Sequence, residues 1–296
     1  MKLGAAWYGF REQTAANYFE MASALGLRYV EIPLYWQIIE DSKYHYHSSE
    51  NIRGLLAMAD RAGVRIVSSV SDFPITFGAT STEGKFGQST VDFGMAAARR
   101  TIDLGAQLGL EVLRIVEPNI NPDDLDTARS RMEECGKAMC ILGDYAADRG
   151  VRIAVENYGL TSEQVNWLLD KANHSAVGTL YDPCNYYRIG EDPLQALKNL
   201  GGRVSYCHLK DAFRNDPRSP DSLFKGSRWP PSEAVGEGEV DWGPILKELS
   251  TFYDGYLCFE YEIAEDVMRG TRVSIEHIRR ISGELEISLK PEEGKQ

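Results

Sequence analysis

Short apolar runs rich in β-branched residues alternate along the chain with longer stretches in which apolar residues recur at helical spacing. The short runs predict eight strands, over 3–8, 29–34, 65–70, 111–116, 152–157, 178–182, 204–209 and 256–261. The stretches between them predict helices over 14–26, 49–63, 90–109, 126–150, 161–173, 192–201 and 241–250. Several of these helices end in glycine just before the next strand, which is the stop signal expected where a helix returns to a sheet.

This strict alternation predicts the fold class. Strands that are each followed by a helix form a parallel sheet with right-handed crossovers, and eight repeats close into a barrel. We therefore expect an α/β fold, a single-domain (β/α)8 TIM barrel over residues 1–282, with a C-terminal extension over 283–296. An open doubly wound sheet is the alternative, but the first strand-to-helix turn, residues 7–14, lacks the glycine-rich phosphate-binding turn of dinucleotide folds.

Two segments that follow strands are longer than the usual connection of roughly 2 to 6 residues. Residues 212–236, between the seventh strand and its helix, contain four prolines and almost no periodicity. Residues 71–89 follow the third strand and belong to the same end of the barrel. Long irregular loops at that end predict a lid or a binding loop.

Charge and composition narrow the choice of partners. The 296 residues carry a formal net charge of -12 and a sequence pI of about 5.0, which opposes binding to nucleic acid or to an anionic membrane surface. No apolar run approaches the roughly 18 residues of a membrane span. The first residues lack a secretory signal, so a cytoplasmic location is expected. The five cysteines are scattered without a C-x-x-C pair, and we expect reduced, packing residues.

Four polar residues close apolar strands or lie inside them near the end where a barrel of this type builds its active site. In strands five to eight these are Glu156, Asp182, His208 and Glu260. A buried ionised carboxylate is costly unless a cation or hydrogen bonds offset the cost. Three carboxylates and one imidazole therefore predict one divalent metal ion, and oxygen-rich ligation favours Mn²⁺, with Mg²⁺ and Co²⁺ as alternatives.

The spacing of these residues supports one ligand from each of four consecutive strands. Asp182 lies 26 positions after Glu156 and 26 positions before His208, about one strand–helix unit each time. Glu260 lies 52 positions after His208, which is one unit plus the long loop. Taken alone, a strand-end Asp often caps a helix and a buried His often packs in a core, but four in consecutive strands indicate a metal site. Glu262 shares a strand face with Glu260 and is the alternative ligand.

Several motifs carry a family resemblance, which spans nearly the whole chain and is strongest over residues 151–262. They are VENYG (155–159), LYDPCN (180–185), HLKD (208–211), GEGEVDW (236–242) and GYLCFEYE (255–262). This series resembles the xylose-isomerase-like barrels of the sugar phosphate isomerase/epimerase superfamily. That superfamily includes ketose 3-epimerases, inosose isomerases and dehydratases, hydroxypyruvate isomerases and, more distantly, endonuclease IV.

The resemblance implies a function for the four strand-end residues. All four become metal ligands, and Glu156 and Glu260 are also placed to move protons on opposite faces of a bound ketose. The implied enzyme of carbohydrate metabolism is a metal-dependent isomerase or epimerase of a ketose, keto-sugar or cyclitol, which abstracts a proton α to a carbonyl through a metal-stabilised enediolate. The alternative is a carbon–oxygen lyase on the same scaffold, either an inosose-type dehydratase or an enzyme that eliminates the aglycone of a 3-keto-glycoside.

Seven further residues are candidates for binding the substrate: Trp7, Trp36, Phe73, Glu117, Asn185, Lys210 and Arg214. The aromatic residues follow strands one to three and can stack on a sugar ring or simply pack under loops. Asn185 stands where ketose 3-epimerases typically carry a histidine, and Arg214 where they place a substrate-binding arginine. Lys210 shares a strand face with His208 and can hold a substrate oxygen. Glu117 closes the fourth strand and either faces the site or forms a salt bridge.

Two other function classes make different demands. A DNA-repair endonuclease needs a basic face and a histidine-rich zinc cluster, which five histidines and a net charge of -12 do not favour. A non-catalytic barrel would purify without metal.

The expected partner is a small-molecule sugar or keto-sugar. Barrels of the family often form dimers or tetramers, so a homo-oligomer is an open alternative.

Overall fold

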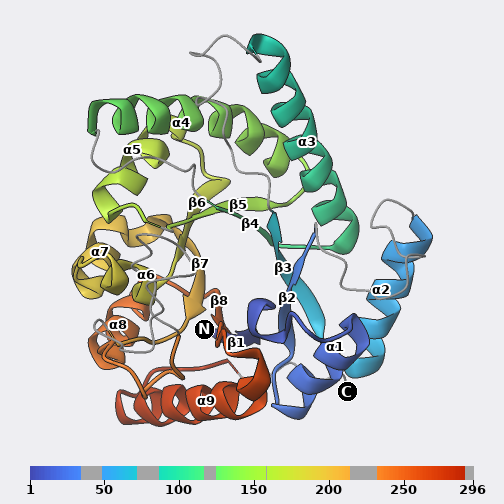
Figure 1. Cartoon of the computed structure of the whole chain (residues 1–296), viewed down its shortest axis with the longest axis vertical. Coiled ribbons are helices and arrows are strands. Elements are labelled where there is room, and N and C mark those ends of the chain that lie inside the picture. Colours follow the sequence, from blue (N-terminus) through green and yellow to red (C-terminus); the bar gives the residue numbers. More distant parts are fainter. Residues whose placement is uncertain (35–48, 72–86, 117–124, 158, 214–231, 291–296) are drawn as a thin grey trace.

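Eight parallel strands close into a barrel in chain order (Figure 1). They are β1 (Lys2–Ala5), β2 (Tyr29–Pro33), β3 (Arg65–Ser71), β4 (Val112–Val116), β5 (Arg152–Glu156), β6 (Val177–Tyr181), β7 (Val204–Leu209) and β8 (Tyr256–Phe259). The chain is described by a computed structural model over residues 1–34, 49–71, 87–116, 125–157, 159–213 and 232–290. Pairing of β8 with β1 completes the ring, so the predicted single-domain (β/α)8 TIM barrel is confirmed.

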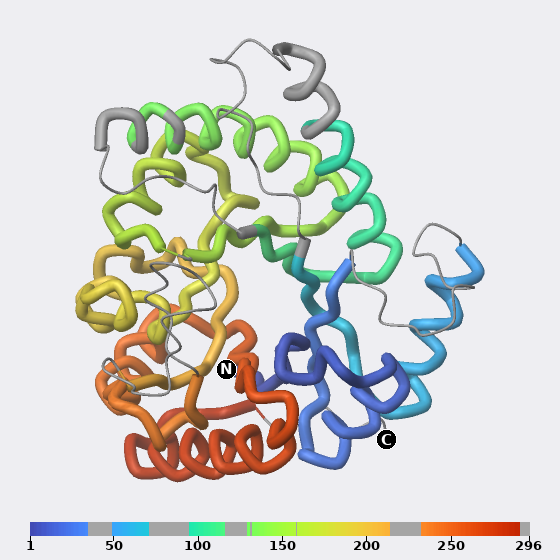
Figure 2. Tube along the Cα trace, in the orientation of Figure 1, coloured from blue at the N-terminus to red at the C-terminus, as the bar shows by residue number. Residues whose placement is uncertain are grey.

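Helices connect the strands and form the outer layer (Figures 1 and 2). They are α1 (Ala15–Ala24), α2 (Ser49–Ala62), α3 (Gly87–Leu108), α4 (Leu125–Ala147), α5 (Ser162–Ala172), α6 (Pro183–Arg188), α7 (Pro193–Leu200), α8 (Trp242–Leu249) and α9 (Val267–Glu284). Short 3₁₀ helices lie at Tyr8–Phe10, Gly201–Arg203 and Ala264–Asp266. Within the described ranges, none of these helices combines the length and the apolar character that crossing a membrane requires.

Helix starts and ends follow local sequence signals. Thr161 and Gln164 form a capping box at the start of α5, and Thr14 caps α1 by accepting a hydrogen bond from the N–H of Asn17. The helices that precede β2, β3, β4 and β5 are each followed by a glycine with φ between +69° and +75°. These are Gly26, Gly63, Gly109 and Gly150. The predicted glycine stops therefore agree with the structure, because glycine has no Cβ and adopts this conformation without steric cost.

The inside of the barrel has two layers. Toward the N-terminal ends of the strands, inward-facing residues form a separate apolar core of Ala6, Tyr29, Val67, Val112, Ala154, Leu180, Tyr206, Tyr256 and Cys258. Alternate residues of a strand face the same side, so the next inward positions lie two residues further along. On six strands these are charged or ionisable: Glu31, Arg114, Glu156, Asp182, His208 and Glu260. An apolar floor thus supports a charged layer at the end where such barrels build active sites.

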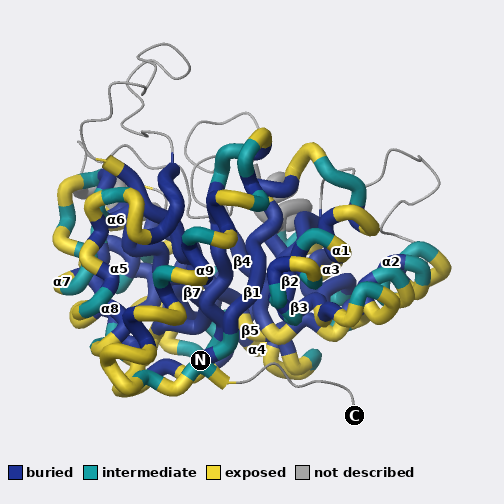
Figure 3. The backbone as a smooth tube through the Cα atoms, turned by 90° about the horizontal axis from the view of Figure 1, so that it is seen from below, coloured by how far each residue is buried: buried dark blue, intermediate teal, exposed yellow. Residues whose placement is uncertain are grey.

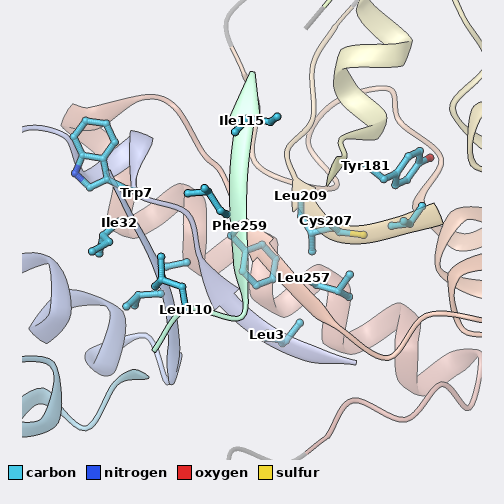
Figure 4. Packing of buried hydrophobic residues seen from close by; sticks show 14 of the residues in the cluster. Leu3, Trp7, Ile32, Leu110, Ile115, Tyr181, Cys207, Leu209, Leu257 and Phe259 are labelled. Carbon is cyan, nitrogen blue, oxygen red and sulfur yellow. The ribbon is translucent and has the colours of Figure 1, made fainter. Parts of the chain in front are cut away.

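The outward faces of the strands pack against the helices in the main hydrophobic core. The strands are buried in the centre of the molecule, and the helices expose only their outer sides (Figure 3). In Figure 4, Leu257 and Phe259 of β8 lie beside Cys207 and Leu209 of β7, their partners in the strand pairing. All five cysteines are free, as expected for packing residues.

The structure contains two helices that the expected set lacks. α6 is a six-residue helix that Asp182 and Pro183 start directly after β6, and it is too short to show periodicity. α9 is an 18-residue helix after β8 with a regular apolar face.

β1 ends three residues earlier than expected, because a 3₁₀ helix begins at Tyr8. The chain after α9 returns to β1, where the Lys290 N–H donates a hydrogen bond to the carbonyl oxygen of Met1 at 2.8 Å.

Candidate metal centre

The four residues predicted to bind a metal converge at the C-terminal end of the barrel. Glu156 ends β5, Asp182 follows β6, His208 lies near the end of β7 and Glu260 follows β8. One ligand-type atom from each residue lies within 4.8 Å of the corresponding atoms of the others. None of the four residues is more than 2% exposed. The sequence-predicted ligands therefore share one buried site.

Asp182 and Glu260 are held from their outer sides. Asp182 caps α6, since its Oδ1 accepts hydrogen bonds from the N–H groups of Cys184 and Asn185 at 3.0 and 3.2 Å. Its other oxygen, Oδ2, lies 3.0 Å from Nζ of Lys210. The same ammonium group donates a hydrogen bond to Oε2 of Glu260 at 2.7 Å. Lys210 thus bridges two candidate ligands.

Glu31 and Arg114 hold the other two candidate ligands, and neither was predicted as a site residue. Arg114 of β4 donates through Nε to Oε2 of Glu156 at 2.6 Å, and its Nη1 lies 3.3 Å from Oε1 of Glu31. Glu31 of β2 places its Oε2 3.1 Å from Nε2 of His208. Arg114 also lies 3.7 Å from Oε1 of Glu260. The sequence signal for both residues is a charge inside an apolar strand, not at its end.

The alternative eighth-strand ligand, Glu262, lies outside the ligand group. Its Oε1 accepts a hydrogen bond from Lys210 at 3.1 Å, and its Oε2 lies 3.4 Å from Nη2 of Arg188 in α6. The Glu262 side chain is 21% exposed, whereas that of Glu260 is 3% exposed. The geometry therefore brings Glu260 into the cluster and leaves Glu262 at its rim, with Lys210 between them.

The charges of this cluster suit a divalent cation. Its five carboxylates are Glu31, Glu156, Asp182, Glu260 and Glu262, and its three cationic side chains are Arg114, Arg188 and Lys210. With His208 neutral, two negative charges are left uncompensated, and one divalent ion neutralises them. Within the described part of the chain, three buried inner atoms make no aligned hydrogen bond: Oε1 of Glu156, Oδ2 of Asp182 and Nδ1 of His208. These atoms are placed to hold such an ion.

Burial and ion pairs shift the pKa values of three candidate ligands in different directions. Burial raises the pKa of Glu156, and the nearby Arg114 offsets this only in part. Burial alone would also raise the pKa of Glu260, but His208 and Lys210 outweigh it, so this pKa lies well below its usual range. Burial lowers the pKa of His208, yet Glu260 and Glu31 raise it to about 10. A metal ion at His208 would therefore have to take the place of a proton.

Three of the seven predicted substrate-binding residues lie in the described part of the chain. Lys210 belongs to the charged cluster, as above. Asn185 is buried, its Nδ2 donates to the carbonyl oxygen of Asn157 at 2.9 Å, and its Oδ1 has no hydrogen-bond partner among the described residues. Trp7 is 4% exposed and packs in the main core, with its ring edge-on to that of Tyr8. The others, Trp36, Phe73, Glu117 and Arg214, lie outside the described residues.

Asp211 anchors the base of the long segment after β7. Its buried carboxylate accepts four hydrogen bonds, each between 2.9 and 3.1 Å. The donors are the backbone N–H groups of Ala212, Gly236 and Val240 and the indole Nε1 of Trp242. The GEGEVDW motif therefore ties the two ends of the 212–236 segment together, one residue away from Lys210.

The fold and the site define a (β/α)8 barrel with a buried, metal-type ligand cluster on its last four strands. The family model described as xylose isomerase-like TIM barrel matches residues 19–281. The chain therefore belongs to the xylose isomerase-like TIM barrel family, and the resemblance inferred from its motifs is confirmed.

Named relatives and solved structures extend this result. An inosose dehydratase from Clostridium perfringens is 31% identical over 130 residues, covering 41% of this chain and 44% of that protein, so the match spans less than half of the relative. A D-tagatose 3-epimerase-like protein superposes with a TM-score of 0.72 at 17% identity, covering 96% of this chain and 100% of the other. The IolI protein with a bound zinc atom gives 0.71 at 17% identity, with 96% and 99% covered. At these identities the two structures share the fold.

Proposed function

We propose that this protein is a divalent-metal-dependent isomerase or epimerase of a ketose, keto-sugar or cyclitol-derived ketone. The observation that carries the proposal is the group of four buried ligand-type atoms, two of which belong to glutamates that can also move protons. An ion bound there supplies Lewis-acid polarisation of a carbonyl oxygen and its neighbouring hydroxyl oxygen. The ligand set suits a divalent ion, with Mn²⁺ as our first candidate because of its oxygen-rich ligands. The structure of the same fold with a bound zinc atom supports a divalent ion, and the epimerase-like structure supports the reaction class.

Glu156 and Glu260 are the proposed proton-transfer residues. They come from the two ends of the arc formed by β5 to β8, so a substrate held between them meets a carboxylate on each side. One carboxylate removes the proton from the carbon next to the carbonyl, and the other returns a proton to the opposite face or to the adjacent carbon. Asp182 and His208 serve as fixed supports, and the ammonium of Lys210 is placed to hold a substrate oxygen.

A lyase is the second candidate, and two observations favour it. The curated relatives at 31% identity are named inosose dehydratases. In addition, Lys210 places a proton-bearing ammonium 2.7 Å from Oε2 of Glu260. In a dehydration, a carboxylate takes the α-proton, the electron pair forms a carbon–carbon double bond, and the β carbon–oxygen bond breaks. The departing hydroxide then needs a proton to leave as water, and Lys210 can donate it.

Mass and isotope content of the product distinguish the two reactions. We would incubate the Mn²⁺-loaded protein in D₂O with ketoses, inososes and 3-keto-glycosides and analyse the products by mass spectrometry. An isomerase or epimerase incorporates deuterium at carbon without any other change of mass. A lyase releases water or an aglycone. If no substrate in this panel exchanges an α-proton, the proposal of α-proton abstraction fails.

Glutamine variants test the two proton-transfer residues. Glu156→Gln and Glu260→Gln keep the shape of the side chain and remove the base, so turnover should fall by roughly 100- to 10,000-fold while the circular dichroism spectrum is retained. Glu111→Gln is the matched control, because it breaks a carboxylate–arginine pair with Arg65 at the opposite end of the barrel. Turnover within tenfold of the wild type in both site variants would contradict the assignment.

A further inference from the structure

We propose that Glu31 is a positioning residue of the metal centre, which fixes His208 in the tautomer whose Nδ1 faces the ion, and that Arg114 holds Glu31 and Glu156 together for this purpose. The inference rests on the proposed function, since it concerns the same site. It assigns a role to two buried residues from β2 and β4, strands that contribute no candidate ligand within the described part of the chain.

The burial of Glu31 is difficult to explain without a specific partner. Its side chain is fully buried in a strand whose neighbours, Val30 and Ile32, are apolar, so its charge is costly there. The pairing register of β2 with β3 shifts between Val30 and Glu31. Irregularities of this kind redirect a side chain and are common beside active sites. The hydroxyl of Tyr18 donates to the carbonyl oxygen of Glu31 at 2.9 Å, so the backbone is also fixed at this point.

The contact between Glu31 and His208 decides which imidazole nitrogen can bind a cation. An ionised carboxylate only accepts hydrogen bonds, so in the neutral imidazole the proton lies on Nε2, 3.1 Å from Oε2 of Glu31. Nδ1 then presents its lone pair to the opposite side, where Oε2 of Glu260 lies at 3.2 Å and Oε1 of Glu156 at 3.8 Å. Orientation of a ligating histidine through its second nitrogen is a general feature of metal sites.

Arg114 couples Glu31 to a second candidate ligand. Its guanidinium donates to Oε2 of Glu156 at 2.6 Å and approaches Oε1 of Glu31 at 3.3 Å. One oxygen of each carboxylate is therefore engaged, which leaves Oε2 of Glu31 for His208 and Oε1 of Glu156 for the ion. A planar guanidinium presents its N–H groups in fixed directions, whereas the donors of a lysine ammonium rotate about a flexible stem.

The competing explanation is that Glu31 only neutralises the buried charge of Arg114. That role requires a negative charge near Arg114 but no directed contact with His208. Loss of the charge would then destabilise the protein and weaken the electrostatic attraction for the ion, but it would leave the coordination geometry unchanged. The two explanations therefore differ in whether loss of Glu31 changes the coordination geometry of a bound metal.

The test is a titration of the purified, chelator-treated full chain with Mn²⁺ and Co²⁺. We would compare the wild type, Glu31→Gln and Glu111→Gln by calorimetry and by the visible d–d spectrum of bound Co²⁺. Glu31→Gln should bind both ions roughly 10- to 100-fold more weakly. Its d–d spectrum at saturation should also change, because the glutamine amide can donate to Nε2 and move the imidazole proton to Nδ1. Glu111→Gln should match the wild type in both measurements.

The outcomes separate this inference from the proposed function. An equal Co²⁺ spectrum in the wild type and Glu31→Gln, whatever the affinity of the variant, would overturn the role of Glu31 and leave a metal-dependent enzyme in place. Absence of stoichiometric Co²⁺ or Mn²⁺ binding to the wild type would overturn both. If Glu31→Gln does not fold, Arg114→Lys serves in its place, since it keeps the charge and should still weaken binding by loosening Glu31 and Glu156.

Discussion

The buried ammonium of Lys210 compensates the same carboxylates that a metal ion would. Its Nζ lies 2.7 Å from Oε2 of Glu260, 3.0 Å from Oδ2 of Asp182 and 3.1 Å from Oε1 of Glu262, and the residue is 2% exposed. Lys210→Met keeps most of the apolar stem and removes the charge. We expect the metal-free variant to lose stability and the metal-bound variant to lose much less.

The size of the effect follows from burial. Removing one partner of a buried ion pair costs about 3–5 kcal/mol, because the other charge is left uncompensated. Glu262 keeps Arg188 as a partner, so the loss falls on Glu260 and Asp182 and should lie near the lower value. At roughly 2–3 °C per kcal/mol, the Tm of the metal-free protein should fall by roughly 6–9 °C. Mn²⁺ should raise the Tm of the variant by more than that of the wild type, since no ammonium then repels the ion.

Differential scanning calorimetry with and without Mn²⁺, after chelator treatment, measures these shifts. Lys137→Met is the matched control, because it removes a half-exposed lysine paired with Glu134 on the surface of α4 and should cost less than about 1 kcal/mol. An unchanged Tm of metal-free Lys210→Met would refute the charge compensation. A smaller Mn²⁺-induced shift in the variant than in the wild type would refute the idea that ammonium and ion balance the same carboxylates.

Proton release and loop anchoring provide two more tests. The pKa of His208 is raised from 6.5 to about 10, so its protonation stabilises the metal-free fold fully below pH 6.5 and progressively less as the pH rises toward 10. Because a metal displaces this proton, the Tm gain from Mn²⁺ should grow between pH 6.5 and 9, and a constant gain in calorimetry would contradict the assignment. Asp211→Asn should cost about 1–3 kcal/mol and speed proteolytic cleavage within 212–236, and an unchanged cleavage rate would rule out the anchor.

The four candidate ligands could be predicted because two simple rules act together on strand ends. Counting eight strand–helix units fixes a barrel, and in a barrel every strand delivers its last residue to the same end. A carboxylate that closes an apolar strand, as Glu156 and Asp182 do, must then meet the polar residues of its neighbours. The same rules could not choose between Glu260 and Glu262, since both lie on one strand face. The choice depends on how far each extends beyond β8, which only the three-dimensional structure gives.

Glu31 and Arg114 could not be predicted by these rules, because they lie in the middle of their strands and not at the ends. Their charges are visible in YVEIPL and EVLRIV, but whether such a residue faces the inside of the barrel or the helices depends on strand register. For Glu31 that register is shifted relative to β3. Their mutual contact joins β2 to β4 across the barrel, and sequence spacing holds no information about pairs of this kind. The short helix α6 was missed for a related reason, since six residues cannot display a helical period.

The two glutamates of the centre differ in the cation that holds them, and this difference bears on the reaction. Arg114, beside Glu156, keeps its charge at any accessible pH and gives up no proton. Lys210, beside Glu260, carries protons that it can donate. In each direction an epimerisation needs a base on one face of the substrate and a proton donor on the other, so in one of the two directions Glu156 must deliver the proton although its neighbour Arg114 supplies none. An elimination needs one base to remove the α-proton and one donor to protonate the departing hydroxide. Glu156 can serve as the base and Lys210 as the donor. The asymmetry of these cations is therefore the structural reason to measure product mass before assigning an epimerase.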